Sequence, residues 1–162
     1  MTTSVKIKRF RLVVVDDNHA DLHVMKEAMT ATAAEIELVE FDNAVTALDY
    51  LRAGNETDML ITDLNMPKMT GADLLLEIVG TPNLCGMALA LTSSCREADL
   101  PTQVRNLPGL TYLRKASDWQ DWQRLARQVY VSLVARDDGS GPSKGKASVV
   151  QRMSTPPATL PQ

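Results

Sequence analysis

The chain has 162 residues, the length of a single ordinary domain, and its 44% apolar residues can build a core that is mostly aliphatic, since only two Trp, three Tyr and two Phe are present. Lysine and arginine number 17 against 20 acidic residues, and this net charge of −3 argues against a protein that coats nucleic acid. Two cysteines, Cys85 and Cys95, are too few for a disulfide scaffold, and no run of about 18 apolar residues exists to span a membrane, so we expect a cytoplasmic protein without membrane contact.

Short apolar runs alternate with helical patterns through residues 1–137. The predicted strands are 12–15, 36–41, 59–62, 87–91 and, more weakly, 110–113. The predicted helices are 21–33, 44–53, 71–79, a short one after Pro101, and 117–136. Strands alternating with helices at this spacing indicate βαβ units. We therefore predict an α/β fold in which helices cover both faces of a doubly wound, five-stranded parallel sheet.

The composition changes after Asp137. Of the 25 residues from 138 to 162, 13 are Gly, Pro, Ser or Thr, and the segment carries a net charge of +2. A stretch this short and this poor in apolar residues cannot bury a core of its own. We therefore predict one domain, 1–137, followed by a disordered tail, 138–162, and no carboxyl-terminal DNA-binding or catalytic domain.

Polar side chains stand where the predicted strands end. Asp16 and Asp17 follow the first strand, Asp63 the third, Thr92 the fourth and Lys115 the fifth. In a doubly wound sheet, ligands bind at the carboxyl ends of the strands. We therefore expect three carboxylates, a hydroxyl and an ammonium to share one crevice.

Three clustered carboxylates repel one another. Two unit charges 4 Å apart cost about 1 kcal/mol in water and about 4 kcal/mol at an effective dielectric of 20. A hard divalent cation, Mg²⁺ or Mn²⁺, would remove this cost, because it prefers oxygen ligands. With a metal and an ammonium nearby, the cluster could hold a phosphoryl group on one carboxylate, whose oxygen is a known nucleophile toward phosphorus.

These residues resemble a known family. The set DD (16–17), TDLNMPKMTG (62–71), TS (92–93) and Lys115, with Tyr112 three residues before it, is similar to the receiver domain of two-component response regulators. The resemblance covers about residues 9–135. The segments DDNHAD and DLNMPK resemble the single-domain receivers that partner bacterial phytochrome histidine kinases. The resemblance implies a flavodoxin-like (βα)5 fold with strand order 2-1-3-4-5.

The resemblance also implies a role for each site residue. Asp63 would accept the phosphoryl group from a kinase phosphohistidine. The carboxylates of Asp16, Asp17 and Asp63, together with the backbone carbonyl of Asn65, would bind Mg²⁺. Lys115 would contact the phosphoryl group. The protein would then be a stand-alone switch in a phosphorelay rather than an enzyme in the ordinary sense.

Two further residues would transmit the signal. The Thr92 hydroxyl would move onto the phosphoryl group, and Tyr112 would rotate into the vacated space. The surface made by the fourth helix, the fifth strand and the fifth helix would then change shape and bind a downstream partner. The first helix would face the kinase, with Ala20 and Val24 as candidate contacts.

The last predicted helix has a broad apolar surface. One stripe should cover the sheet, and its members are Trp119, Trp122, Ala126, Val129 and Leu133. Four more apolar residues lie off this stripe, namely Leu125, Tyr130, Val131 and Val134. We therefore predict a homodimer through this helix and the neighbouring strand, with Trp119 and Trp122 as candidate contacts.

The chain departs from the family at one position. The family usually has Lys-Pro with a cis peptide bond, whereas Ala116 follows Lys115 here. A cis bond before alanine costs about 3–4 kcal/mol, against about 0.5–1 kcal/mol before proline. We therefore expect either a strained cis bond or a trans bond with a displaced lysine.

Other functions remain open at this point. A phosphate-independent scaffold is one alternative. A Mg²⁺-dependent phosphatase that works through an aspartyl phosphate is another, although Asn65 stands where such enzymes favour an acid, and an amide cannot supply a proton. His19 and His23 have the spacing of a zinc-binding pair but lack an evident third ligand, so we expect exposed side chains.

Overall fold

The computed structural model describes residues 7–139 as five parallel strands and five α-helices. The strands are β1 (Phe10–Val15), β2 (Ile36–Phe41), β3 (Met59–Asp63), β4 (Ala88–Ser93) and β5 (Leu110–Arg114). Their order in the sheet is β2-β1-β3-β4-β5. This confirms the predicted doubly wound fold and its strand order.

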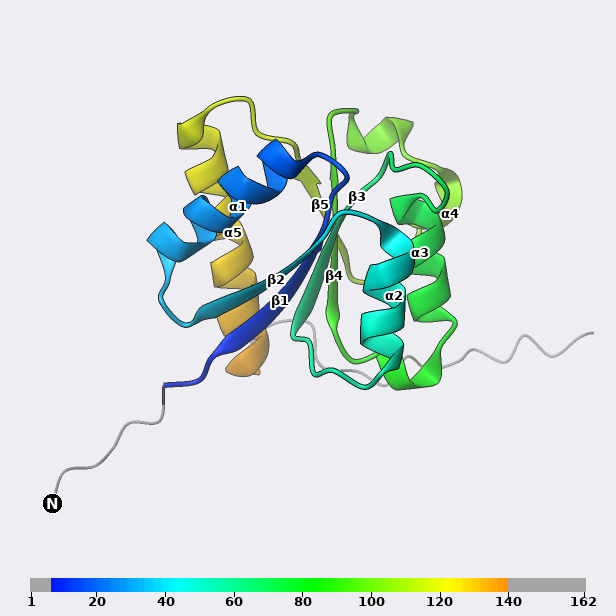
Figure 1. Cartoon of the computed structure of the whole chain (residues 1–162), viewed down its shortest axis with the longest axis horizontal. Helices are drawn as coiled ribbons and strands as arrows, with labels where there is room; N and C mark the ends of the chain where they lie inside the picture. The colour runs from blue at the N-terminus through cyan, green and yellow to red at the C-terminus, as the bar shows by residue number, and fades with distance from the viewer. Residues whose placement is uncertain (1–6, 140–162) are drawn as a thin grey trace, which may run out of the picture.

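Helices cover both faces of the sheet, as Figure 1 shows. On one face lie α1 (His19–Thr32) and α5 (Trp119–Asp137); on the other lie α2 (Ala44–Arg52), α3 (Gly71–Val79) and the short α4 (Thr102–Arg105). Two 3-10 turns that the sequence patterns did not reveal, η1 (Pro82–Leu84) and η2 (Glu97–Asp99), flank β4. In the part of the chain that the structure describes, no helix combines the length and the apolar character that crossing a bilayer requires.

Each face of the sheet has its own aliphatic core. Alternate β1 residues point to opposite sides, because successive strand side chains alternate. Leu12 and Val14 pack with α1 and α5, whereas Val13 and Val15 pack with α2 and α3. All four are almost fully buried, which explains why the run 12–15 is continuously apolar.

The strand ladder aligns the polar ends of the central strands. Asp63, the last residue of β3, is paired in register with Thr92 of β4. Ser93 is paired with Arg114 of β5, and the Ser93 carbonyl accepts a hydrogen bond from the Lys115 backbone N–H at 2.9 Å. Thr92 and Ser93 thus belong to β4 instead of following it, and this register brings the fourth and fifth strand ends beside Asp63.

The last helix differs from its predicted pattern. Trp122 is buried in the core, and Leu125, placed off the stripe by the sequence pattern, is buried with it. Trp122 is therefore corrected from a partner contact to a core residue. Trp119, at the first turn of α5, is 46% exposed, and Val131 is also exposed. The predicted tail, 138–162, lies almost wholly outside the described residues.

The start of α3 is held by a capping box. The Thr70 hydroxyl accepts a hydrogen bond from the Asp73 N–H at 3.1 Å, and the Asp73 carboxylate accepts one from the Thr70 N–H at 3.1 Å. We expect Thr70→Ala to lower the free energy of unfolding by about 1 kcal/mol, measured by urea denaturation. The control Thr30→Ala lies on the exposed side of α1 and should change it by less than about 0.5 kcal/mol. Equal effects of the two substitutions would contradict a capping role.

Candidate functional site

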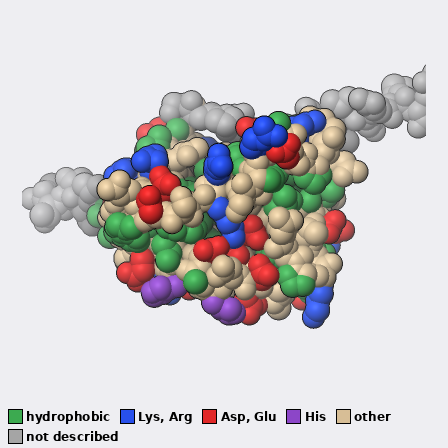
Figure 2. Space-filling model, turned by 90° about the horizontal axis from the view of Figure 1, so that it is seen from above, with side chains coloured by type: hydrophobic (Ala, Val, Ile, Leu, Met, Phe, Trp, Pro, Cys, Tyr) green, Lys and Arg blue, Asp and Glu red, His purple; other side chains and the backbone are tan. Residues whose placement is uncertain are grey.

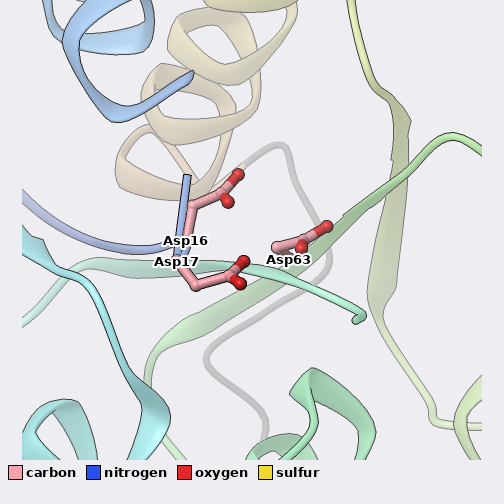
Figure 3. Close-up of side chains that lie close together, drawn as sticks. All are labelled: Asp16, Asp17 and Asp63. Carbon is pink, nitrogen blue, oxygen red and sulfur yellow. The ribbon is translucent and has the colours of Figure 1, made fainter. Parts of the chain in front are cut away.

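Three carboxylates meet at the carboxyl edge of the sheet. Asp16 and Asp17 directly follow β1, and Asp63 ends the neighbouring β3. One carboxylate oxygen from each lies within 4.8 Å of the others, and the three side chains converge in Figure 3. Seen from this end in Figure 2, acidic side chains gather near the centre of the face, with the histidines toward its rim. We call Asp16, Asp17 and Asp63 the acidic triad.

The acidic triad fits a hard divalent cation. Its three ligand atoms are carboxylate oxygens, the donor type that Mg²⁺ and Mn²⁺ prefer. Asp16 and Asp63 are buried, whereas Asp17 is exposed, so an ion could enter from solvent and keep some of its water. Asn65 lies two residues beyond Asp63 and is exposed.

This arrangement raises the pKa of the Asp63 carboxyl. Burial and, to a smaller extent, the neighbouring Asp16 charge raise its pKa to about 6, against the opposing effects of Lys115 and of the hydrogen bond from the Leu64 backbone N–H. The cluster is therefore electrostatically costly without a cation.

Lys115 reaches the site from the end of β5. Its ammonium lies 2.8 Å from Asp16 Oδ2, 2.8 Å from Asp21 Oδ2 and 3.4 Å from Asp63 Oδ1. Burial on its own would lower the Lys115 pKa, but the hydrogen bonds to Asp16 and Asp21 and the charges around it raise that pKa above its ordinary value. The lysine therefore remains charged at neutral pH.

The peptide bond between Lys115 and Ala116 is trans. The expected alternative of a strained cis bond is thus wrong for this chain. The ammonium still lies beside Asp63, so a trans bond is compatible with a lysine at this site.

Gly71 sets the position of the Asp63 backbone. Its N–H donates to the Leu64 carbonyl at 2.9 Å, and a Cβ built on Gly71 would lie 1.9 Å from the Asp63 carbonyl oxygen. No side chain fits in this space. The glycine that begins α3 therefore allows the loop after β3 to fold back against the end of that strand.

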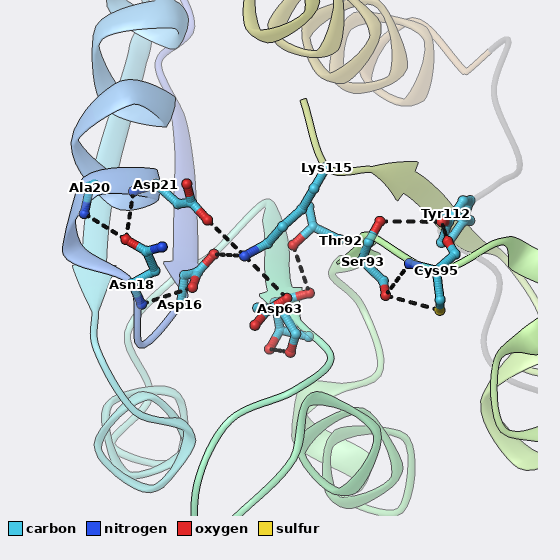
Figure 4. A network of polar contacts seen from close by, with 11 residues as sticks. Asp16, Asn18, Ala20, Asp21, Asp63, Thr92, Ser93, Cys95, Tyr112 and Lys115 are labelled. Atoms are coloured by element: carbon cyan, nitrogen blue, oxygen red, sulfur yellow. Dashed lines mark hydrogen bonds and ion pairs between the residues drawn. The ribbon is translucent and has the colours of Figure 1, made fainter. Parts of the chain in front are cut away.

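Thr92 of β4 is paired in register with Asp63, and Tyr112 lies one strand farther from the acidic triad, on β5. The Thr92 hydroxyl donates to the Thr62 carbonyl at 3.4 Å and is buried. The half-buried Tyr112 hydroxyl donates to the backbone carbonyls of Ser93, the last residue of β4, and Cys95, just beyond it, as Figure 4 shows. Tyr112 is thus bonded to the same strand end that carries Thr92.

The structure also places the residues considered for contacts on the first helix. Ala20 is exposed on the first turn of α1, and Val24 is half-buried against the core. His19 and His23 are exposed as expected, and His19 Nε2 lies 3.7 Å from Asp42 Oδ2. Within residues 7–139, the acidic triad is the one group of His, Cys, Asp or Glu side chains close enough to hold an ion.

The sequence patterns missed Asp21 as a site residue. An acidic side chain in the first turn of a helix is common, because it interacts favourably with the helix dipole. The available signal was its position in the helix that directly follows the Asp16-Asp17 pair. Figure 4 shows that its carboxylate turns toward Lys115.

Comparison with known proteins identifies a family for this chain. Residues 12–126 match the family described as the response regulator receiver domain. The two-component response regulator ORR13 of rice (Oryza sativa subsp. japonica) is 33% identical over 94 residues, which span 58% of this chain and 74% of that protein.

Solved structures share the fold. The phosphorylated cyanobacterial phytochrome response regulator RcpA superposes with a TM-score of 0.70 at 23% identity, covering 78% of this chain and 95% of that one. The Mn²⁺-bound form of the response regulator Rcp1 superposes with a TM-score of 0.61 at 19% identity, covering 74% of this chain and 91% of that one.

Proposed function

Since the chain belongs to the response regulator receiver family of two-component signalling, in which an aspartate is phosphorylated, we propose that Asp63 accepts a phosphoryl group from a histidine kinase and that the protein is a phosphorylation-controlled switch. The observation that carries this proposal is the buried Asp63 carboxylate, which lies 3.4 Å from an ammonium and within 4.8 Å of two further carboxylates.

The chemistry requires only this site and a phosphoryl donor. An Asp63 carboxylate oxygen attacks the phosphorus of the kinase phosphohistidine, and the P–N bond breaks as the P–O bond forms. The electron pair passes to the imidazole nitrogen, which takes up a proton. Lys115 stabilises the negative charge of the transferring group, because its ammonium is already beside Asp63.

The proposed phosphoryl transfer also needs a divalent cation. The carboxylates of Asp16, Asp17 and Asp63 and the backbone carbonyl of Asn65 would hold Mg²⁺, with Mn²⁺ as a substitute. The bound ion would neutralise charge on the phosphoryl oxygens. The fit of the acidic triad to a hard cation supports this assignment, and the Rcp1 structure shows that a protein of this fold binds Mn²⁺.

Phosphorylation would be sensed by Thr92 and Tyr112. A phosphoryl group adds about −1.5 to −2 charges and new acceptor oxygens. The Thr92 hydroxyl, paired in register with Asp63, would turn toward them. Tyr112 is bonded to the carbonyls that follow Thr92, so movement of that segment would also move the tyrosine.

The partners of the switch are also proposals. A phytochrome-type kinase fits the likeness in fold to RcpA, and the exposed first turn of α1 with Ala20, next to the acidic triad, is the place for it to dock. The α4–β5–α5 surface, with Tyr112 on β5 and the exposed Trp119 on α5, would bind the downstream protein or a second copy. We place this system in the cytoplasm, where histidine kinases hold their phosphoryl groups.

Incubation with a small acyl phosphate tests the central proposal. We expect intact-mass spectrometry to detect an adduct of about 80 daltons that requires Mg²⁺ and is lost on chelation. Asp63→Asn should form no adduct, because an amide is not a nucleophile toward phosphorus. The control Asp49→Asn, at an exposed carboxylate of α2 outside the site, should be labelled as the natural chain is. Equal labelling of Asp63→Asn, or no labelling of the natural chain, would overturn the proposal.

A further inference from the structure

Lys115 has a partner that the proposed function does not use. Among the described residues, three carboxylates contact its ammonium, and Asp21 is the one of them that lies outside the acidic triad. We infer that Asp21 is a positioning residue, which holds the Lys115 ammonium beside Asp63 when the acidic triad holds a dication. This inference rests on the proposed function, because the lysine matters there through its contact with the phosphoryl group.

The charges explain why such a residue is needed. Without a metal, the Lys115 ammonium forms ion pairs with Asp16, Asp21 and Asp63 and donates a hydrogen bond to Asp21 Oδ2 at 2.8 Å. A dication on the acidic triad draws the electrons of Asp16 and Asp63 toward itself and repels the ammonium. Asp21 keeps its full charge, so its contact with Lys115 is the one that survives metal binding.

The backbone of Lys115 does not by itself fix the position of the side-chain ammonium. The Lys115 N–H is held by the Ser93 carbonyl at 2.9 Å, which anchors the residue to the end of β4. Beyond this anchor, the four-carbon side chain rotates freely unless its ammonium is bound. The Lys115 side chain is 17% exposed, so a route to solvent is open to it if the carboxylates release it.

An ordinary helix-capping role does not account for the Asp21 carboxylate. Asn18 is the N-cap of α1, and its side-chain oxygen accepts from the N–H groups of Ala20 and Asp21 at 3.0 and 3.3 Å. The helix start is therefore already capped without the Asp21 side chain. The Asp21 carboxylate instead crosses to Lys115 and is itself only 27% exposed. Figure 4 shows the ammonium between Asp21 on one side and Asp63 on the other.

The first test measures the rate of phosphorylation by a small acyl phosphate with Mg²⁺. Asp21→Asn should be about tenfold slower, because the ammonium leaves Asp63, and Asp21→Glu should recover part of the rate because it keeps the charge. Glu27→Gln removes one exposed charge from the same helix and should leave the rate unchanged. An Asp21→Asn rate equal to that of the natural chain would overturn the inference while leaving the proposed function intact.

A double-substitution cycle shows whether Asp21 acts through the lysine. In a Lys115→Met background, Asp21→Asn should cause no further loss, because no ammonium remains to be positioned. The same tenfold loss in both backgrounds would mean that Asp21 acts independently of Lys115, and the inference would fail.

A second readout needs no phosphorylation. In ¹⁵N-labelled protein, the Lys115 ammonium, assigned by its absence in Lys115→Met, should give a slowly exchanging NMR signal both without and with Mg²⁺. Asp21→Asn should keep this signal in the metal-free protein and lose it when Mg²⁺ is added. A signal that persists in Asp21→Asn with Mg²⁺, or that is absent from the natural chain, would overturn the inference even if the natural chain takes no phosphoryl group.

Discussion

Replacing Gly71 with alanine is expected to lower the free energy of unfolding by about 3 kcal/mol, the upper end of the usual cost of overpacking. The added methyl group would lie 1.9 Å from the Asp63 carbonyl oxygen and 2.8 Å from the carbonyl carbon. Both are backbone atoms at the end of a central strand, so no side chain can rotate out of the way. Either α3 or the end of β3 has to move.

Gly86→Ala is the matched control, because it adds the same methyl group at a glycine without a close neighbour. A Cβ on Gly86 meets nothing within 4 Å, and Gly86 does not have a positive φ, so its replacement should change stability by less than about 0.5 kcal/mol. Urea denaturation of both variants measures the difference. Because the displaced atoms belong to Asp63, we also expect Gly71→Ala to bind Mg²⁺ more weakly. Equal stabilities of the two variants would contradict the close approach of Gly71 to the strand.

The part of the site that the sequence predicted depends on strand ends. Apolar runs buried on both faces mark central strands, and the first polar residue after such a run marks the carboxyl edge of the sheet. Asp16 and Asp63 follow this rule, and the structure brings them together with Asp17 within 4.8 Å. The periodicity placed α3 at its observed bounds, Gly71–Val79, because Gly80 and Pro82 mark where the helix stops.

What the sequence did not predict depends on contacts between distant segments. Asp21 and Lys115 lie on different elements, 94 positions apart, and no local pattern links them. Leu125 was placed off the stripe that covers the sheet, and Trp122 was named as a partner contact as well as a member of that stripe, because a broad apolar arc does not reveal which part of it faces the sheet. The close approach of Gly71 to the Asp63 carbonyl likewise depends on the path of the loop between them.

In metal-free protein, the burial of Asp63 and the electrostatic repulsion within the acidic triad should make the free energy of unfolding depend on pH. Asp63 has a folded-state pKa of about 6, against the ordinary value of 3.8. Between these values the folded state binds more protons than the unfolded state, so the free energy of unfolding falls as the pH rises from about 4 to 6. The difference of two pKa units corresponds to about 3 kcal/mol lost above pH 6, and the Asp63 side chain is only 8% exposed, so solvent screens little of it.

Asp63→Asn should remove this loss, because an amide does not ionise at any of these pH values. In metal-free buffer at pH 8, urea denaturation should give a free energy of unfolding about 3 kcal/mol higher for Asp63→Asn than for the natural chain, and the two should converge toward pH 4. Mg²⁺ at about 100 times its dissociation constant should stabilise the natural chain by about 2.7 kcal/mol and the variant by less, because the variant lacks one ligand. Asp49→Asn, at an exposed carboxylate of α2, tests whether any lost charge has the same effect. A natural chain that is as stable as Asp63→Asn at pH 8 without metal would show that the acidic triad carries no electrostatic cost, and a dication would then have no strain to relieve.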